Sequence, residues 1–121
     1  MTYDVHEARL IAQQNDAFRT SLGRNPALAG QIVRTASLSV FGPVALFEIV
    51  ERVRNFAQFT PNNDPYGQHD YGTFVIDVDG SPQTICWRID LYDTAYEWGS
   101  AAPSDPERTR RVLTIMLPED Q

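Results

Sequence analysis

Two stretches of the chain repeat apolar residues at the spacing of an amphipathic helix. Residues 4–22 carry the first stripe, with Asp4 at the N-cap position and Gly23 directly after the predicted end. Residues 43–56 carry the second stripe, and Pro43 suits the first turn of that helix. The apolar positions of the two stripes are Leu10, Ile11, Phe18 and Leu22, then Leu46, Ile49, Val50, Val53 and Phe56.

Four other segments have the composition or the alternation of β-strands. Residues 31–40 are rich in β-branched side chains, and residues 73–79 and 84–93 alternate apolar and polar positions. Asp79 and Gly80 separate the last two segments, which predicts an antiparallel hairpin. Residues 110–117 are apolar on both faces, which favours a central strand.

The order of these elements predicts an α+β fold, because the strands must bury one face and the helices are the available partner. We expect a two-layer sandwich in the order α-β-α-β-β-β, with about four mainly antiparallel strands and both helices on one face. The length of 121 residues suits a single domain over residues 1–121, with residues 57–72 forming a long polar loop.

Composition narrows the cellular setting. Sixteen acidic residues against ten basic ones, all of them Arg, give a net charge of −6, which argues against direct binding of nucleic acid. The single cysteine, Cys86, excludes an internal disulfide and favours the reducing cytoplasm. No apolar run reaches the length of a membrane span, and the N-terminal residues do not form a signal peptide, so we expect no membrane association.

The polar loop contains the sequence NNDPYGQHDYG over residues 62–72, which invites comparison with metal-binding loops. As a calcium loop it offers only Asp64 and Asp70 as carboxylates, and Thr73 stands where a bidentate Glu is needed. The His69-Asp70 pair resembles that of metal phosphohydrolases, but such a site needs several histidines and the chain has two in all. A capped turn fits the composition better, and we predict no cofactor; a site of His69 with Asp64, Asp70 or Asp90 stays open.

General acid–base chemistry is the enzymatic reading that the residues best allow. Its candidate catalytic residues are His69, Asp70, Asp90 and Tyr92. The alternative is that Arg88 pairs with Asp77 or Asp90 across a solvated sheet face. The same region also predicts an acidic and aromatic binding surface. Its candidate residues are Asp64, Tyr66, His69, Asp70, Trp87, Asp90, Tyr92, Asp93 and Glu97.

Three segments together resemble the bacterial domain-of-unknown-function family DUF 3768: FTPNNDPYGQHDYGTF, WRIDLYD and EWGSAAPSDPERTRRVLTIMLPED. The resemblance covers about residues 8 to 120. It implies a small, soluble protein, mostly of proteobacteria and often of mobile-element surroundings, without a known reaction. Gln68 departs from the family pattern, which has Glu there, and so removes a possible ligand or base.

The hypothesis that these observations favour is a non-enzymatic, acidic interaction protein that binds another protein. Acidity and mobile-element surroundings predict a partner with a basic, nucleic-acid-binding surface, as an inhibitor of a host defence complex such as an anti-CRISPR protein would have. The alternative is a small enzyme or metal-binding protein that uses His69, Asp70 and Asp90. The oligomeric state is left open.

Overall fold

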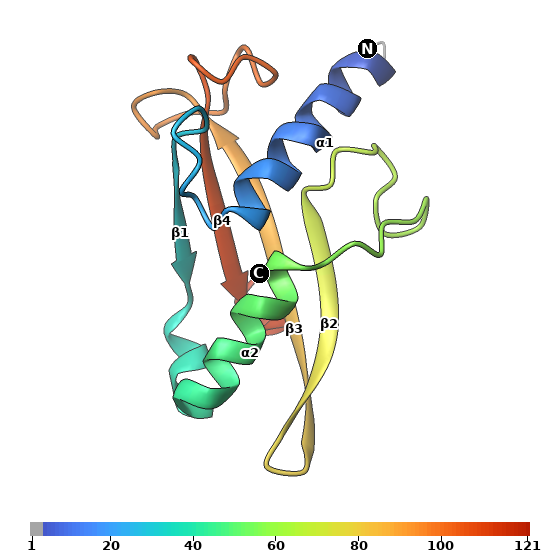
Figure 1. Ribbon diagram of the computed structural model, residues 1–121, viewed down its shortest axis with the longest axis vertical. Helices are drawn as coiled ribbons and strands as arrows, with labels where there is room; N and C mark the ends of the chain where they lie inside the picture. The colour runs from blue at the N-terminus through green and yellow to red at the C-terminus, as the bar shows by residue number, and fades with distance from the viewer. Residues whose placement is uncertain (1–3) are drawn as a thin grey trace.

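The computed structural model describes residues 4–121, so the first three residues of the predicted domain lie outside the described part. Figure 1 shows two α-helices lying across one face of a four-stranded sheet. The α+β class and the order of helices and strands are therefore confirmed. The elements are α1 (Val5–Thr20), β1 (Gly30–Arg34), η1 (Ala36–Phe41), α2 (Gly42–Arg54), β2 (Tyr71–Val78), β3 (Ser81–Tyr92), β4 (Arg110–Met116) and η2 (Pro118–Asp120).

Helix α1 begins and ends where its sequence signals lie. The Asp4 side chain accepts hydrogen bonds from the backbone N–H groups of His6 and Glu7, at 2.9 and 3.1 Å. At the other end Gly23 takes a positive φ of 74°, and its N–H donates to the Phe18 carbonyl. The capped helix turns one apolar face toward the sheet.

The sheet is mixed rather than mainly antiparallel, which corrects the prediction. Its strand order is β1-β4-β3-β2, in which β1 runs parallel to β4 and the other pairs are antiparallel. Helix α2 and the β2–β3 hairpin lie between β1 and β4 in the chain, and this long connection lets β4 lie parallel to β1. Strand β4 is central, as its two apolar faces predicted.

The predicted strand 31–40 is wrong in its second half. Strand β1 ends at Arg34, and Thr35 donates the last ladder bond to the Ile115 carbonyl at 3.0 Å. The chain then turns into the 3-10 helix η1, which buries Leu38 completely. The Ser37 hydroxyl donates to the Asp120 carboxylate at 2.9 Å. Because Asp120 is far away in the sequence, local patterns could not predict this contact.

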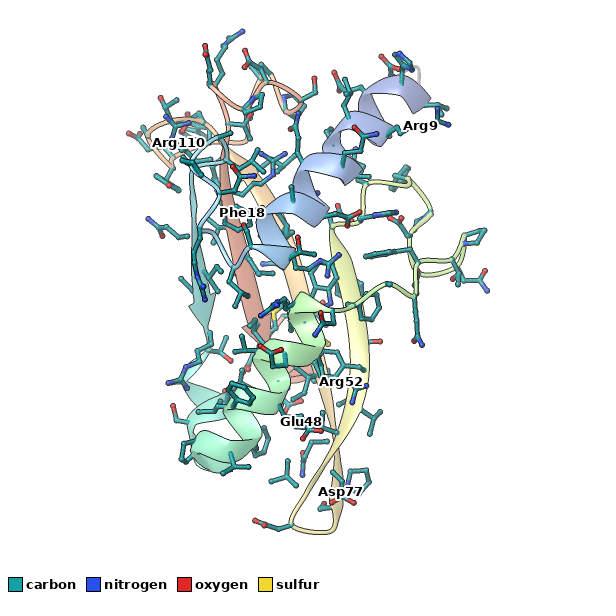
Figure 2. The ribbon with its side chains drawn as sticks, viewed as in Figure 1. Arg9, Phe18, Glu48, Arg52, Asp77 and Arg110 are labelled. Carbon is teal, nitrogen blue, oxygen red and sulfur yellow. The ribbon has the colours of Figure 1, made fainter. Side chains whose placement is uncertain are left out.

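The core lies between the two helices and one face of the sheet, and Figure 2 shows Phe18 on the inner side of α1. Strand alternation sends Phe74, Ile85 and Trp87 into this core, as the pattern predicted. The opposite face of the sheet carries polar side chains such as Arg88 and Asp90. The fully or nearly buried core residues are Phe18, Leu28, Leu38, Ile49, Val53, Phe74, Ile76, Ile85, Trp87, Ile89, Leu113 and Ile115.

Candidate functional site

The polar loop after α2 is held in shape by its own side chains. The Asn63 side chain accepts from the backbone N–H of Thr60 at 2.8 Å and donates to the Gln58 carbonyl at 2.8 Å. The Asp64 N–H donates to the Thr60 carbonyl at 2.8 Å. These bonds make a capped turn of the kind that Asn and Asp favour, which presents His69 toward α1.

His69 occupies an unusual backbone conformation and an aromatic stack. Its φ is 54°, in the left-handed region that most side chains avoid, and its N–H donates to the Asp64 carboxylate at 3.2 Å. The imidazole lies parallel to the Phe59 ring, with centroids 3.9 Å apart and planes 2° apart. Stacking on Phe59 therefore fixes the plane of the imidazole, and the hydrogen bond to Asp64 fixes the backbone of His69.

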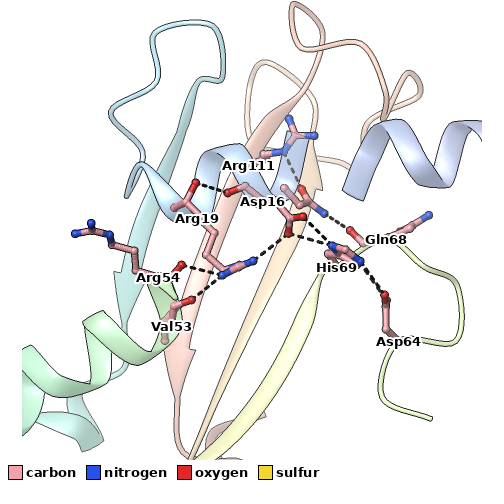
Figure 3. A network of polar contacts seen from close by, with 10 residues as sticks. Asp16, Arg19, Val53, Arg54, Asp64, Gln68, His69 and Arg111 are labelled. Carbon is pink, nitrogen blue, oxygen red and sulfur yellow. Dashed lines mark hydrogen bonds and ion pairs between the residues drawn. The ribbon is translucent and has the colours of Figure 1, made fainter. Parts of the chain in front are cut away.

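Both ring nitrogens of His69 face carboxylates, as Figure 3 shows. Nδ1 lies 2.9 and 3.1 Å from the two carboxylate oxygens of Asp16, and Nε2 lies 3.6 Å from Asp64 Oδ2. The Asp64 side chain is only 6% exposed. A general base needs one nitrogen directed at the substrate's proton. Asp16 engages Nδ1, whereas Asp64 Oδ2 lies beyond hydrogen-bond distance of Nε2. The contact that the geometry fixes is therefore the pair with Asp16, which acts as a clamp that ties the polar loop to α1.

Asp16 extends the clamp to α2 through the buried Arg19. The guanidinium donates to Asp16 at 2.9 Å and to the carbonyls of Val53 and Arg54 at 2.8 and 3.0 Å, which lie at the end of α2. It also lies over the Trp87 ring, 4.9 Å from the centroid. Burial lowers the pKa of Arg19, and the hydrogen bond and charge of Asp16 partly offset that effect. One network therefore joins α1, the end of α2 and the polar loop.

A second buried arginine anchors the same helix to β4. Arg111 is fully buried, and its Nε and one terminal nitrogen donate to Asn15 at 2.9 Å and to Gln14 at 2.7 Å. Asn15 in turn donates to the Gln68 carbonyl at 2.9 Å, next to His69. Burial lowers the pKa of Arg111 to about 10. Neither arginine was predicted from sequence, although Arg19 lies next to Phe18 in the buried part of α1.

The structure does not bring His69 and Asp90 into contact. Asp90 forms an ion pair with Arg88 at 2.9 Å, one of the two pairings that the sequence allowed. The neighbouring Ile89 is buried in the core, so strand alternation places Asp90 on the opposite face of the sheet. The carbonyl of Asp70 accepts from the Ile89 N–H at 2.8 Å, which attaches the end of the loop to β3.

Asp70 lies in a crowded acidic setting. Burial raises the pKa of its carboxyl, a backbone hydrogen bond opposes the rise, and the charges of Asp64 and Asp90 add to it. Within residues 4–121, no three His, Cys, Asp or Glu side chains are grouped so that they could hold a metal ion. At His69 the reason is geometric, because Asp16 and Asp64 lie at opposite nitrogens of the ring.

Two residues of the predicted binding surface, Trp87 and Asp93, instead contribute to the core and to a turn. Trp87 is fully buried, which removes it from the surface: its alternation with Ile85 and Ile89 directs it into the core. Asp93 caps a turn by accepting from the N–H groups of Ala95 and Glu97, at 3.2 and 3.0 Å. Tyr92 is half-buried, whereas Tyr66 and Glu97 are exposed on separate loops.

Two depressions flank the Asp16–His69 pair. One has a volume of about 300 Å³ and lies between the first turns of α1 and Gly67; the other, of about 380 Å³, lies between the end of α1 and Phe59. Both are lined by Asp16 and His69 themselves. The pair thus forms a ridge between two hollows, rather than the floor of one enclosed pocket.

A group of exposed apolar side chains lies on η1 and α2, away from His69. Val40, Val44 and Phe47 are 82%, 84% and 70% exposed, and we call these three residues the α2 patch. Val44 and Phe47 lie on α2 outside its predicted buried stripe, and Val40 lies on η1. Sequence reasoning missed Val40 because it lay in the predicted strand 31–40, and it did not use the departure of Val44 and Phe47 from the helix stripe.

Comparison with known proteins places most of the chain in one family model. Residues 34–120 match the model described as a protein of unknown function, DUF3768, which confirms the resemblance drawn from the polar loop and the WRIDLYD segment. The match begins at Arg34, so Asp16 and Arg19 lie outside it. No curated protein and no solved structure was found to match. None of the helices in residues 4–121 has both the length and the apolar character needed to cross a bilayer.

Proposed function

We propose that this chain, which belongs to the DUF3768 family of proteins of unknown function, works by binding another protein. The observation that carries the proposal is the α2 patch. Large apolar side chains exposed in a contiguous group are typical of protein interfaces, because their burial in a partner removes apolar area from water. Scattered single residues would need no such explanation.

The geometry of the α2 patch suits a groove on a partner. Val44 and Phe47 are three residues apart on α2 and therefore share one face of that helix, and Val40 lies on the 3-10 turn η1 that leads into it. Glu48 and Glu51 follow on the same helix, and Figure 2 shows Glu48 on the part of α2 that faces the hairpin. Glu51 is already paired with Arg54 at 3.5 Å, so it is the exposed Glu48 beside the apolar patch that favours an apolar groove with a basic rim.

The surface charge supports the same kind of partner. Two of the ten arginines, Arg19 and Arg111, are 2% and 0% exposed, so the solvent-facing groups are more acidic than the net charge of −6 indicates. Such a surface attracts basic proteins over distances comparable to the Debye length. We therefore propose a cytoplasmic partner whose basic surface normally holds nucleic acid, as in an anti-defence inhibitor encoded by a mobile element.

The experiment compares capture of lysate proteins by immobilised wild-type protein and by the Phe47→Asp variant. Leu10→Asp is the matched control, because Leu10 is 45% exposed on the other α-helix and the charge change is the same. We expect Phe47→Asp to lose the captured protein, Leu10→Asp to retain it, and high salt to weaken capture by the wild type.

Equal capture by wild type and Phe47→Asp would contradict the role of the α2 patch. Capture that does not respond to salt would contradict the basic partner. Thermal unfolding of both variants checks their folding; we expect a change within about 0.5 kcal/mol for Phe47→Asp, whose side chain is 70% exposed, and a somewhat larger one for Leu10→Asp.

A further inference from the structure

One edge of the sheet is open along its full length. Strand β1 pairs only with β4, and residues 31–34 are all exposed, with Ile32 and Val33 at 37% and 41%. Two hydrogen bonds show that Ala29 and Thr35 bond toward β4: Arg111 N–H donates to the Ala29 carbonyl, and Thr35 N–H donates to the Ile115 carbonyl. By parallel-strand alternation, Gly30, Ile32 and Arg34 direct their backbone groups outward.

The opposite edge of the sheet is protected. On β2, the Val75 carbonyl accepts a hydrogen bond from Arg52 at 3.5 Å, and the Arg52 guanidinium lies over the Phe74 ring, 4.8 Å from its centroid. Figure 2 shows Arg52 reaching from α2 toward β2. A charged side chain laid over an edge strand is a known device against edge-to-edge pairing. The described residues include no such cover for the outward groups of β1.

We propose that β1 pairs antiparallel with β1 of a second copy of this chain, which joins the two sheets into one. The register that uses the whole strand places Ile32 opposite Ile32 and Gly30 opposite Arg34. In that register the outward backbone groups of Gly30, Ile32 and Arg34 form about six hydrogen bonds across the two-fold axis. The alternative parallel register sets the two Arg34 side chains side by side and is disfavoured by their like charges.

Charge complementarity favours a second copy as the occupant. Arg34 forms one long hydrogen bond, to the Ser39 hydroxyl at 3.4 Å, and no ion pair with any described residue. A groove of about 660 Å³ lies at the other end of β1 and is lined by Ala29, Asp105 and Glu107, among others. Figure 2 shows Arg110, which also lines this groove, near the upper end of β1. The antiparallel register brings Arg34 of each copy to this acidic groove of the other.

The protected β2 edge limits the assembly to a closed pair. Pairing of β1 with β2 of another copy would leave one free edge at each end and would extend into a filament. Because Arg52 lies over the middle of the β2 edge at Val75, the β1–β1 contact is the less hindered one. Strand β1 has five residues, so the contact is small, and we expect a weak dimer that forms only at high concentration.

Sedimentation velocity of the full chain from micromolar to millimolar concentration tests this inference. We expect the mass to rise from one chain toward two in the wild type. Ile32→Pro should remain monomeric, since proline removes an outward N–H and leaves the bonds to β4 intact. Val75→Pro is the matched control, because Val75 is exposed on the protected edge and its carbonyl likewise faces outward; it should dimerise like the wild type.

A charge exchange tests the register without proline. Arg34→Glu should weaken dimerisation at least about tenfold, and Arg34→Glu combined with Glu107→Arg should restore it, because the pair is re-formed with the charges reversed. A mass of one chain in the wild type at every concentration would overturn the inference. A dimer that persists in Ile32→Pro would also overturn it, since the contact would then lie elsewhere. If the double variant dimerised as weakly as Arg34→Glu alone, the proposed antiparallel register would be overturned.

Discussion

At the scale of single residues, His69, a catalytic candidate from sequence, makes the contacts that hold the polar loop against α1. Its ring is stacked on Phe59, and its nitrogens face Asp16 and Asp64. Asp16 also accepts a hydrogen bond from the buried Arg19, so one carboxylate contacts both Arg19 and the His69 imidazole. The sequence interval of 53 residues between Asp16 and His69 explains why no local motif announced this pair.

Replacement of Asp16 by Asn tests the clamp. We expect a loss of about 1–2 kcal/mol of unfolding free energy, because Arg19 remains buried without its counter-charge. This expected loss is smaller than is usual when a buried ion pair is broken, because Asp16 is 39% exposed and solvent screens its charge. Chemical denaturation measures the change, and Glu48→Gln, at an exposed carboxylate on α2, is the control. An Asp16→Asn variant as stable as the control would contradict the clamp.

At the scale of elements, the contact between β2 and β3 depends on one close approach beneath the polar loop. Gly72 lies directly against the indole of Trp87, and a Cβ there would overlap that ring and the ring of Phe56. Phe56 and Trp87 meet edge to face, with centroids 5.5 Å apart. The start of β2 thus accommodates Trp87 only because residue 72 has no side chain, a requirement that alternation alone could not indicate.

Substitution of Gly72 by Ala therefore has a sharp expected outcome. We expect destabilisation of about 2–3 kcal/mol, because the added methyl group must displace two buried aromatic rings. Gly99→Ala is the matched control, since a Cβ at Gly99 meets nothing within 4 Å, and we expect a change within about 0.5 kcal/mol. Thermal unfolding of both variants measures the difference, and equal melting temperatures would argue against the close packing.

At the scale of the whole molecule, the helices cover one face of the sheet and η2 covers part of the other. The Asp120 carboxylate accepts from the hydroxyls of Thr35 and Ser37 at 2.7 and 2.9 Å, so it links η2 to the segment after β1. The Gln121 side chain donates to the Cys86 sulfur at 3.5 Å, and Cys86 is 1% exposed. We call this arrangement the η2 latch; it explains how Cys86 is buried on the otherwise polar face.

The η2 latch makes two predictions, one for the reactivity of the Cys86 thiol and one for the pH dependence of the protein's stability. Replacement of Asp120 by Asn should speed alkylation of Cys86, whereas Glu119→Gln, on the adjacent exposed carboxylate, should not. The hydrogen bonds from Thr35, the Leu117 N–H and Ser37 lower the pKa of Asp120 below its usual 3.8. The stabilisation by this carboxylate is therefore present above pH 3.8 and is lost as the pH falls through the lowered value.

Acid unfolding of Asp120→Asn and wild type measures this second effect. The variant lacks the titrating group, so its stability should fall less steeply in that acidic range than the stability of the wild type. Equal alkylation rates in Asp120→Asn and Glu119→Gln would show that η2 does not shield Cys86. Parallel acid-unfolding curves would show that Asp120 contributes nothing to the pH dependence.

The sequence by itself determined the features that depend on neighbouring residues. Apolar periodicity placed both α-helices and the β2–β3 hairpin, and strand alternation assigned Phe74, Ile85 and Trp87 to one face. The tertiary structure decided the direction and short length of β1, the 3-10 turn after it and the partners of His69. These features depend on contacts such as Thr35 with Asp120 and His69 with Asp16, which join residues 85 and 53 positions apart. Local propensity carries no information about such contacts, because the chain brings their members together only when the two layers pack.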